Sequence, residues 1–283
     1  MFLAIGERLN ATRKSVAKAL GKRDAAFVRD EIDKQISGGA SIIDLNGGTS
    51  PDQEPGNLAW LANTAAAHCD VPICVDSANP EVIEAAIEAF LKVRKASAPD
   101  AFEIQPGLPW LMINSITADK ECYEVLLPLV KKYNCAVVAM CLGAGGADAG
   151  VDARITSGTD LVARMISDGV GVERIFIDPL VMPLGVDGQN ATATASVIKE
   201  LKRRYPGLRA ACGLSNISLG LPARSLLNRT FLAMLIGAGL DAAIMDTSDA
   251  GMMRSLWAAL ALNGKDDYCA DFIKAFRQGT LTK

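Results

Sequence analysis

Short apolar runs that end in Asp or Asn recur along this 283-residue chain. They end at Asp44, Asp76, Asn114, Asp178 and Asp246, with spacings of 32, 38, 64 and 68 residues. The last two spacings are each about twice a βα unit of roughly 30–40 residues, which indicates a further run within each gap. A strand that presents a polar residue at its C-terminal end, once per βα unit, is typical of the catalytic end of a (β/α)8 barrel.

Eight apolar runs have the length expected of strands, and segments with helical periodicity lie between them. The predicted strands are Phe2–Ile5, Ser41–Leu45, Pro72–Val75, Trp110–Ile113, Cys135–Met140, Arg174–Ile177, Arg209–Cys212 and Ala242–Met245. The predicted helices are Asp24–Ser37, Pro80–Lys95, Lys120–Tyr133, Thr159–Asp168, Thr192–Tyr205, Arg224–Gly237, Gly251–Asn263 and Asp266–Arg277. This alternation implies parallel strands joined by right-handed crossovers. We therefore predict an α/β fold, a (β/α)8 TIM barrel in a single domain over residues 1–283, with an extra C-terminal helix.

Two irregular stretches fall at opposite ends of this predicted barrel. Ala96–Gly107 precedes the fourth strand, so we expect it at the bottom. Gly143–Gly150 follows the fifth strand and is expected at the top. Its Gly-Ala-Gly-Gly sequence could cradle a phosphate, but it lacks the Lys-Ser/Thr of a P-loop and the full dinucleotide fingerprint, which favours a mobile lid.

Composition narrows the class of protein. Half of the residues are hydrophobic, and the formal net charge is −3 at pH 7. Lys and Arg are spread along the chain, whereas a nucleic-acid binder normally has a clustered basic face. There is no run of about 18 apolar residues that could span a membrane, and the first residues lack the basic start and cleavage site of a signal peptide. We expect a soluble cytoplasmic protein with no nucleic-acid or membrane partner.

Metal and nucleophile chemistry has few candidates in the sequence. None of the seven cysteines forms a C-x-x-C pair, and most lie in apolar runs, so we interpret them as buried structural thiols. The one histidine, His68, is predicted to face solvent on a helix. A zinc site or a Ser-His-Asp triad is therefore disfavoured, and the carboxylate spacing matches no compact metal motif. We expect no intrinsic metal.

The polar residues at the predicted rim mostly accept hydrogen bonds or carry amides. They are Glu7, Asn10, Asp44, Asn46, Asp76, Asn114, Asp178, Ser215, Asn216 and Asp246. No lysine directly follows a strand, so a Schiff-base mechanism has no candidate. A carboxylate pairs well with two adjacent N–H groups, and an asparagine offers both a donor and an acceptor. This inventory indicates a ligand rich in N–H donors, such as the 2-amino-4-oxo pyrimidine ring of a pterin.

Several rim residues have a structural alternative. An Asp after a strand often caps the next helix, and Asp76 and Asp246 both fit that role. Asp178 is followed by Pro179, which restricts it to an extended conformation. The segment Gly213–Arg224 could be a simple loop with a helix cap. Alternatively, Asn216 projects over the site and Arg224 holds an anionic or polar part of the ligand.

Seven stretches in order give the chain a family resemblance. They are Gly6–Asn10, Gly38–Ala40 with Asp44–Asn46, Val75–Ser77, Ile113–Ser115, Ile177–Leu180, Gly213–Ser218 and Asn228–Leu232. In these the chain resembles the pterin-binding methyltransferases that act between methyltetrahydrofolate and a corrinoid protein. It is also similar to the folate domain of cobalamin-dependent methionine synthase. The resemblance covers essentially the whole chain.

The resemblance implies that Asp76, Asn114 and Asp178 hold the pterin ring and that Asn216 lies beside N5 of the folate. N5 must gain a proton before the methyl group leaves, and the asparagine amide oxygen can stabilise the developing N5–H⁺. We assign the catalytic step to Asn216 and Asp178. The other expected folate-binding residues are Asp44, Glu7, Asn10, Gly213, Ser215 and Arg224.

The same resemblance implies the partners. The substrates are methyltetrahydrofolate and tetrahydrofolate, and the methyl acceptor is the Co(I) of a cobamide carried by a corrinoid protein that docks at the open C-terminal face of the barrel. The transfer can run in either direction, and a homodimer is expected. The chain departs from acetogen-type members at Leu219, where they have a polar side chain, and in the small, apolar Gly143–Gly150 loop.

Two alternatives remain at this point. A dihydropteroate synthase has an Arg–His pair after its eighth strand and a lysine near its seventh. This chain has Asp246–Thr247–Ser248–Asp249 and Ser215–Asn216 there, and these acids would repel a pyrophosphate. A non-catalytic folate-binding subunit would keep the pterin-binding residues but would not need Asn216.

Overall fold

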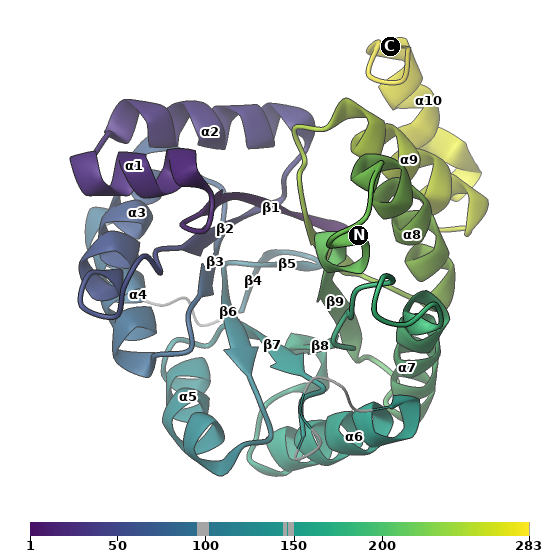
Figure 1. The fold of residues 1–283 in the computed structure, drawn as a ribbon, viewed down its shortest axis with the longest axis horizontal. Helices are drawn as coiled ribbons and strands as arrows, with labels where there is room; N and C mark the ends of the chain where they lie inside the picture. The colour runs from purple at the N-terminus through teal and green to yellow at the C-terminus, as the bar shows by residue number, and fades with distance from the viewer. Residues whose placement is uncertain (95–101, 144–145, 147–149, 283) are drawn as a thin grey trace.

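The computed structural model describes residues 1–94, 102–143, 146 and 150–282. Eight parallel strands close into a barrel with neighbours in the order β1, β2, β3, β6, β7, β8, β9, β10 and back to β1 (Figure 1). The strands are β1 (Leu3–Asn10), β2 (Ile42–Asn46), β3 (Ile73–Asp76), β6 (Leu111–Ile116), β7 (Ala136–Met140), β8 (Ile175–Asp178), β9 (Arg209–Gly213) and β10 (Ala242–Met245). Each overlaps a predicted strand, so the predicted TIM barrel is confirmed.

Helices surround the barrel on the outside (Figure 1). They are α1 (Lys14–Lys22), α2 (Ala25–Gly38), α3 (Glu54–His68), α4 (Pro80–Arg94), α5 (Lys120–Lys132), α6 (Val151–Ser167), α7 (Asn190–Arg204), α8 (Arg224–Ala238), α9 (Ala250–Leu262) and α10 (Ala270–Arg277). All eight predicted helices are found. However, α6 begins well before the predicted Thr159, and neither α1 nor α3 was among the predicted helices.

The prediction of the last helix, Asp266–Arg277, was wrong for its first four residues. Residues Asp267–Cys269 form a separate 3-10 turn, η3, and both Tyr268 and Cys269 have a φ of 55°. This left-handed backbone breaks the helix, so α10 begins at Ala270.

Alternate residues along each strand divide the core into two layers. Leu3, Ile5, Ile42, Cys74, Met112, Val138 and Phe176 belong to one small buried cluster, which fills the barrel. Their neighbours, such as Ala4, Ile43, Val75 and Ile113, belong to the larger cluster that includes the helices. The inward-facing residues two positions further along each strand therefore line the C-terminal mouth.

The first strand is longer than predicted. It runs past Ile5 to Asn10, and its register against β2 shifts between Gly6 and Leu9. A bulge of this kind re-aims the side chains around it. It brings both Glu7 and Asn10 to the mouth of the barrel.

The stretch before the fourth barrel strand was predicted to be irregular, but part of it forms regular structure. Strands β4 (Glu103–Gln105) and β5 (Leu108–Pro109) form a two-stranded antiparallel sheet. Arg209, the first residue of β9, donates to the Gly107 carbonyl at 2.9 Å and pairs with Glu103. The hairpin thus lies at the N-terminal end of the strands, where the stretch was predicted.

Parts of the two stretches predicted to be irregular lie outside the described residues, namely residues 96–101 and, in the predicted lid, residues 144–145 and 147–149.

The prediction of buried thiols is correct for Cys74, Cys135, Cys141 and Cys212. Cys269 is exposed, so it is not a core thiol. His68 is only partly exposed, and its Nε2 lies 2.7 Å from Asp33 Oδ1.

Candidate functional site

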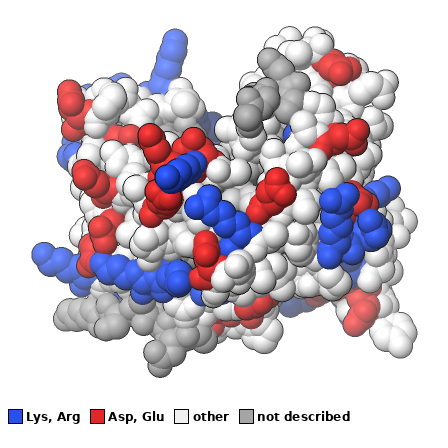
Figure 2. Space-filling model, turned by 90° about the horizontal axis from the view of Figure 1, so that it is seen from below, with Lys and Arg blue, Asp and Glu red and all other residues white. Residues whose placement is uncertain are grey.

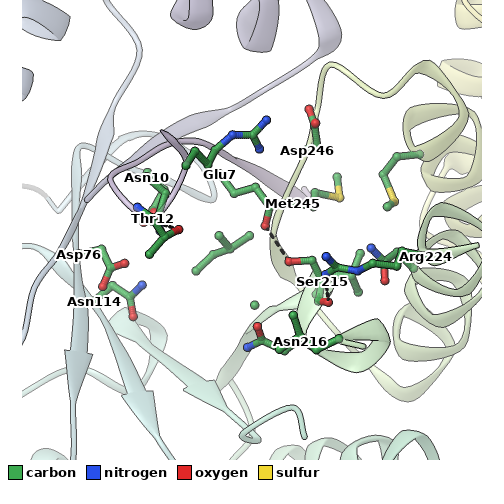
Figure 3. Close-up of a pocket in the computed structure, with 18 of the residues that line it drawn as sticks. Glu7, Asn10, Thr12, Asp76, Asn114, Ser215, Asn216, Arg224, Met245 and Asp246 are labelled. Carbon is green, nitrogen blue, oxygen red and sulfur yellow. Dashed lines mark hydrogen bonds between the residues drawn. The ribbon is translucent and has the colours of Figure 1, made fainter. Parts of the chain in front are cut away.

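A polar pocket of about 700 Å³ opens at the C-terminal mouth of the barrel (Figure 3). All ten residues predicted for the folate site line it: Glu7, Asn10, Asp44, Asp76, Asn114, Asp178, Gly213, Ser215, Asn216 and Arg224. They come from six of the eight barrel strands and from the segment after β9. The structure therefore brings together residues that lie up to 217 positions apart, Glu7 and Arg224.

The pocket floor continues the inward alternation of the barrel core. Asp44 follows Ile42, Asp76 follows Cys74, and Asn114 follows Met112, each two positions further along its strand. Asp76 and Asn114 are register partners on neighbouring strands, which places them side by side (Figure 3). Parallel strands with a shared inward period thus assemble a polar layer directly above an apolar one.

Hydrogen bonds hold several of these groups in place. Asn46 donates from Nδ2 to Asp76 Oδ2 at 3.0 Å, so Asn46 acts behind the pocket rather than in its wall. Ser215 donates from Oγ to Glu7 Oε2 at 3.2 Å and joins the two sides of the mouth. Asp178 Oδ1 accepts from the Leu180 N–H at 2.8 Å. The buried Arg154 donates to the carbonyls of Pro179 and Leu180 and so fixes this turn.

Burial raises the pKa of every carboxyl group on the floor. The pKa of Asp178 rises to about 6 because the group is desolvated, although the Leu180 N–H opposes this. Burial raises the pKa of Asp44 well above its usual value, and the neighbouring Asp76 raises it further. Burial also raises the pKa of Asp76, against the opposing hydrogen bond from Asn46. The pocket floor thus carries carboxyl groups that can accept hydrogen bonds and are not paired with a cation among the described residues.

Two buried oxygens of the pocket have no hydrogen-bond partner within the described part of the chain. They are Asp44 Oδ1 on the floor and Asn228 Oδ1 on α8. An unsatisfied buried acceptor destabilises a protein by about 1–3 kcal/mol. A ligand with N–H donors would satisfy both oxygens, which agrees with the ligand chemistry predicted from the sequence.

The segment after β9 forms a 3-10 turn, η2 (Leu214–Ser218), that presents Asn216 at the exposed edge of the pocket (Figure 3). A Cβ atom on Gly213 would lie 3.1 Å from Asn216 Nδ2, so glycine leaves room for this side chain. Arg224 donates from Nε to Ser218 Oγ at 3.0 Å and from Nη2 to the Ser215 carbonyl at 2.9 Å. Arg224 therefore holds this turn in addition to lining the pocket.

Helix capping does not explain the rim acids. Asn79 accepts from the Glu81 N–H at the start of α4, in place of Asp76. Asp249 caps α9, whereas Asp246 pairs with Arg8 at 2.9 Å. The interpretation of Asp76 and Asp246 as caps was wrong, because the helices begin four or five residues after these strands end.

Sequence reasoning missed several residues of the pocket wall: Thr12, Arg13, Met140, Asn228, Ile244, Asp249 and Met252. Met140 and Ile244 could have been found from the inward period of their strands. Asn228 lay in a recognised stretch but had no assigned role. Arg13 could not be found from the strand period, because it lies in the turn between β1 and α1.

The wider surface has no marked charge separation in the view of Figure 2. Lys and Arg side chains are interspersed with Asp and Glu on that face. Among the described helices, none is long and apolar enough to cross a membrane. Within the described part of the chain, no three His, Cys, Asp or Glu side chains lie together in a way that could hold a metal ion.

Comparisons with known proteins agree with the pocket chemistry. The sequence profile of the pterin binding enzyme family matches residues 6–94 and 104–246. A methylcorrinoid:tetrahydrofolate methyltransferase from Eubacterium limosum is 33% identical over 99% of this chain and 98% of its own length. The methionine synthase of Mycobacterium tuberculosis is 29% identical over 87% of this chain, which spans 20% of that larger protein.

Solved structures show the same fold. The Yersinia pestis DHPS with a pterine-sulfa conjugate superposes with a TM-score of 0.63 at 16% identity, covering 93% of this chain and 94% of its own. A Mycobacterium tuberculosis protein superposes with a TM-score of 0.62 at 22% identity, covering 93% of each chain. Taken with the family profile and the full-length relative, the pocket identifies this chain as a member of the pterin-binding enzyme family, in its group of methyltetrahydrofolate–corrinoid methyltransferases.

Proposed function

We propose that this protein transfers a methyl group between N5 of methyltetrahydrofolate and the cobalt of a corrinoid protein, in either direction. The observation that carries the proposal is the pocket itself. Asp76, Asn114 and Asp178 converge on its floor, and Asn216 lies at its exposed edge. The relative from Eubacterium limosum, which aligns over the full chain, supports the same reaction.

The pterin ring fits the floor by its hydrogen-bonding pattern. Its 2-amino group and N3–H offer two adjacent donors, which a single carboxylate accepts in a bidentate pair. We assign this role to Asp178, with Asp76 and Asn114 binding the remaining ring edge. The unpartnered Asp44 Oδ1 below them supplies a further acceptor.

Asn216 acts on the reacting nitrogen. When the N5–CH₃ bond breaks, its electron pair stays on N5, so the leaving group is poor unless N5 carries a proton. The amide oxygen of Asn216 accepts a hydrogen bond from this N5–H⁺ and stabilises the charge that develops. The cobamide supplies a Co(I) nucleophile that accepts the methyl group, and it is carried by the partner protein.

The position of Asn216 requires an open mouth. Asn216 and Leu219 are exposed on the same side of the pocket, so a partner can reach the methyl group from solvent. We propose that the corrinoid protein docks here, at the C-terminal face. We also propose that the chain acts as one domain, in the cytoplasm, as a homodimer. The exposed apolar side chains Leu262, Tyr268 and Phe276 near α9 and α10 support the dimer.

A dihydropteroate synthase activity is not favoured by the pocket. Asp246 and Asp249 line the wall after β10, and the arginines beside them, Arg8 and Arg229, are already paired with these carboxylates, so this segment offers a pyrophosphate group no unpaired cation.

One experiment separates transfer from binding. Methyltetrahydrofolate is titrated into the protein and the complex is mixed with a reduced Co(I) corrinoid protein, while the cobalt absorbance is followed. We expect methyl-cobalt to form with loss of the Co(I) band. Folate binding without methyl-cobalt formation across several corrinoid proteins would favour a non-catalytic subunit, and absence of folate binding would refute the proposal.

A further inference from the structure

Two arginines line the pocket beyond the C-terminal ends of β1 and β9. Arg13 directly precedes α1, and Arg224 is the first residue of α8. Both line the pocket. In Figure 3, Arg224 lies on the far side of the pocket from Asp76 and Asn114. The pocket is thus acidic at its floor and has its cations at the rim.

These two cations are not equivalent. The Arg224 guanidinium is already bound to Ser218 Oγ and the Ser215 carbonyl. The Arg13 side chain is partly buried and makes no hydrogen bond or ion pair with any described residue. An arginine half removed from water without a partner is a ready site for an anion.

The acids near Arg13 do not neutralise it. Asp246 is paired with Arg8 at 2.9 Å, and Asp249 is paired with Arg229 at 2.6 Å. Glu7 accepts from Ser215, and burial raises its pKa, against smaller opposing effects that include the charges of Arg13 and Arg224. Among the described residues, these two rim acids are thus paired with other arginines, and neither Arg13 nor Arg224 forms an ion pair.

A folate bound by its pterin ring on the floor must extend its p-aminobenzoyl-glutamate arm towards the rim. The glutamate end is the anionic part of the molecule, and each added γ-linked glutamate adds another carboxylate. The arm also contains an amide N–H, for which the unpartnered Asn228 Oδ1 is a suitable acceptor.

We infer that Arg13, with Arg224 beside the same pocket, binds the glutamate carboxylates of the folate, so that the preferred substrate is a tetrahydrofolate with more than one glutamate. This inference rests on the proposed function, because it takes the ligand to be a folate. The inference adds to the proposed function a specificity-determining residue, Arg13, and a substrate class, the polyglutamylated folates.

The test compares three ligands with and without a glutamate arm. Calorimetry measures the Kd of 6-methyltetrahydropterin, 5-methyltetrahydrofolate monoglutamate and its triglutamate for the wild type and for Arg13→Gln. We expect the wild type to bind the triglutamate most tightly. In Arg13→Gln the Kd of both folates should rise about five- to twentyfold, with the larger change for the triglutamate, while the Kd of the tail-free pterin stays within about twofold.

Lys14→Gln is the matched control, because Lys14 is the adjacent cation but is exposed and does not line the pocket. It should leave all three Kd values unchanged. Arg13→Gln should fold normally, since Arg13 contributes only backbone groups to the local structure: its N–H donates to the Asn10 carbonyl at 3.0 Å, and its carbonyl accepts from the Ala17 N–H at 2.9 Å.

Two results would overturn the inference while leaving the proposed function standing. These are an equal loss of affinity for all three ligands, and no loss for either folate. If the wild type binds none of the three ligands, the proposed function fails and the inference falls with it.

Discussion

At the scale of single residues, the site is defined by carboxyl groups that are buried without cations. Asp44, Asp76 and Asp178 all have raised pKa values, and desolvation is the largest cause for each. Such groups are poorly satisfied in the free protein and gain most from a ligand that brings N–H donors. The proposed roles of Asn216 and Asp178 lead to separate predictions, because one concerns rate and the other affinity.

Replacing Asn216 with Ala should lower the rate of methyl transfer about 10²–10³-fold, because the amide oxygen stabilises charge that exists only when N5 is protonated. The affinity for methyltetrahydrofolate should fall less than about tenfold. Stopped-flow measurement of methyl-cobalt formation and calorimetry give the two quantities. Asn63→Ala, on the exposed face of α3, should change neither. An equal fall in rate and affinity would contradict the assigned role.

Binding of the pterin ring should depend on pH through Asp178, whose pKa is about 6 in the free protein. The ionised form accepts the two ring N–H groups, so affinity should be constant above pH 6 and fall about tenfold per unit below it. Asp178→Asn should bind about 10²-fold more weakly at neutral pH and should lose this pH dependence between pH 5 and 8. Unchanged affinity in the variant would remove Asp178 from the ring site.

The same residue should destabilise the free protein at neutral pH. Its pKa is 3.8 in the unfolded chain and about 6 when folded, so the folded state holds the proton more tightly. Stability contributed by the protonated group is therefore lost as pH rises from about 4 to about 6. Asp178→Asn keeps an Oδ1 acceptor for Leu180 and should raise the free energy of unfolding by about 1–3 kcal/mol at pH 7, with no gain near pH 4. Urea denaturation at the two pH values measures this difference.

At the scale of elements, close contacts between loops and helices position the rim. The last residue of α2, Gly38, lies so near the β10–α9 loop that a Cβ atom would be 2.1 Å from the Thr247 carbonyl oxygen. Thr247 Oγ1 in turn donates to the Gln35 carbonyl at 3.1 Å. A glycine is required here for close approach, since the neighbouring Thr247 carbonyl belongs to rigid backbone.

Gly38→Ala should therefore destabilise the protein by about 2–4 kcal/mol, because the helix end and the loop must separate. Gly21→Ala is the matched control, since Gly21 lies inside α1 and a Cβ atom there would meet nothing within 4 Å. That substitution should stabilise by about 0.5–1 kcal/mol through helix propensity. Denaturant midpoints of the two variants should move in opposite directions; a shared direction would refute the close-contact argument.

At the scale of the whole molecule, Arg8 links the first barrel strand to the segment that follows the last one. From β1 it donates to Glu31 on α2 at 2.7 Å and to Asp246 after β10 at 2.9 Å, where the first and last strands close the barrel. Burial disfavours ionisation of Glu31, but hydrogen bonds from Arg8 and Lys34 outweigh it and lower its pKa. The Glu31 side chain is only 6% exposed, so the ion pair is well shielded from water.

Arg8→Gln should lower the free energy of unfolding by about 2–3 kcal/mol at pH 7, because Glu31 keeps its charge without its principal partner. Lys34→Gln removes the exposed partner of the same carboxylate and should have no measurable effect. Because the folded pKa of Glu31 lies below its ordinary 4.5, the difference between wild type and Arg8→Gln should shrink as pH falls below about 4.5. A difference that persists at pH 3 would assign the effect to packing of Arg8.

The strand positions and most of the pocket could be predicted from the sequence because both follow from a local period. Apolar residues at alternate positions mark the inward face, and the next inward residue after Cys74, Met112 or Phe176 is Asp76, Asn114 or Asp178. This alternation is visible within a few consecutive residues, so it can be recognised without the tertiary structure. Eight helices were predicted from the same kind of local signal, whereas α1 and α3 were not.

The partners of the charged rim residues could not be predicted in this way, since they come from distant parts of the chain. Asp246 pairs with Arg8, 238 positions away, instead of capping a helix. Arg224 holds η2, and Arg13 lines the pocket from the turn that follows β1. The sequence by itself determined the barrel and its polar floor, because alternation within a strand fixes which side chains face inward. Only the tertiary structure decided which rim charges are neutralised and which remain for a ligand, because pairing and burial depend on what closure of the barrel brings together.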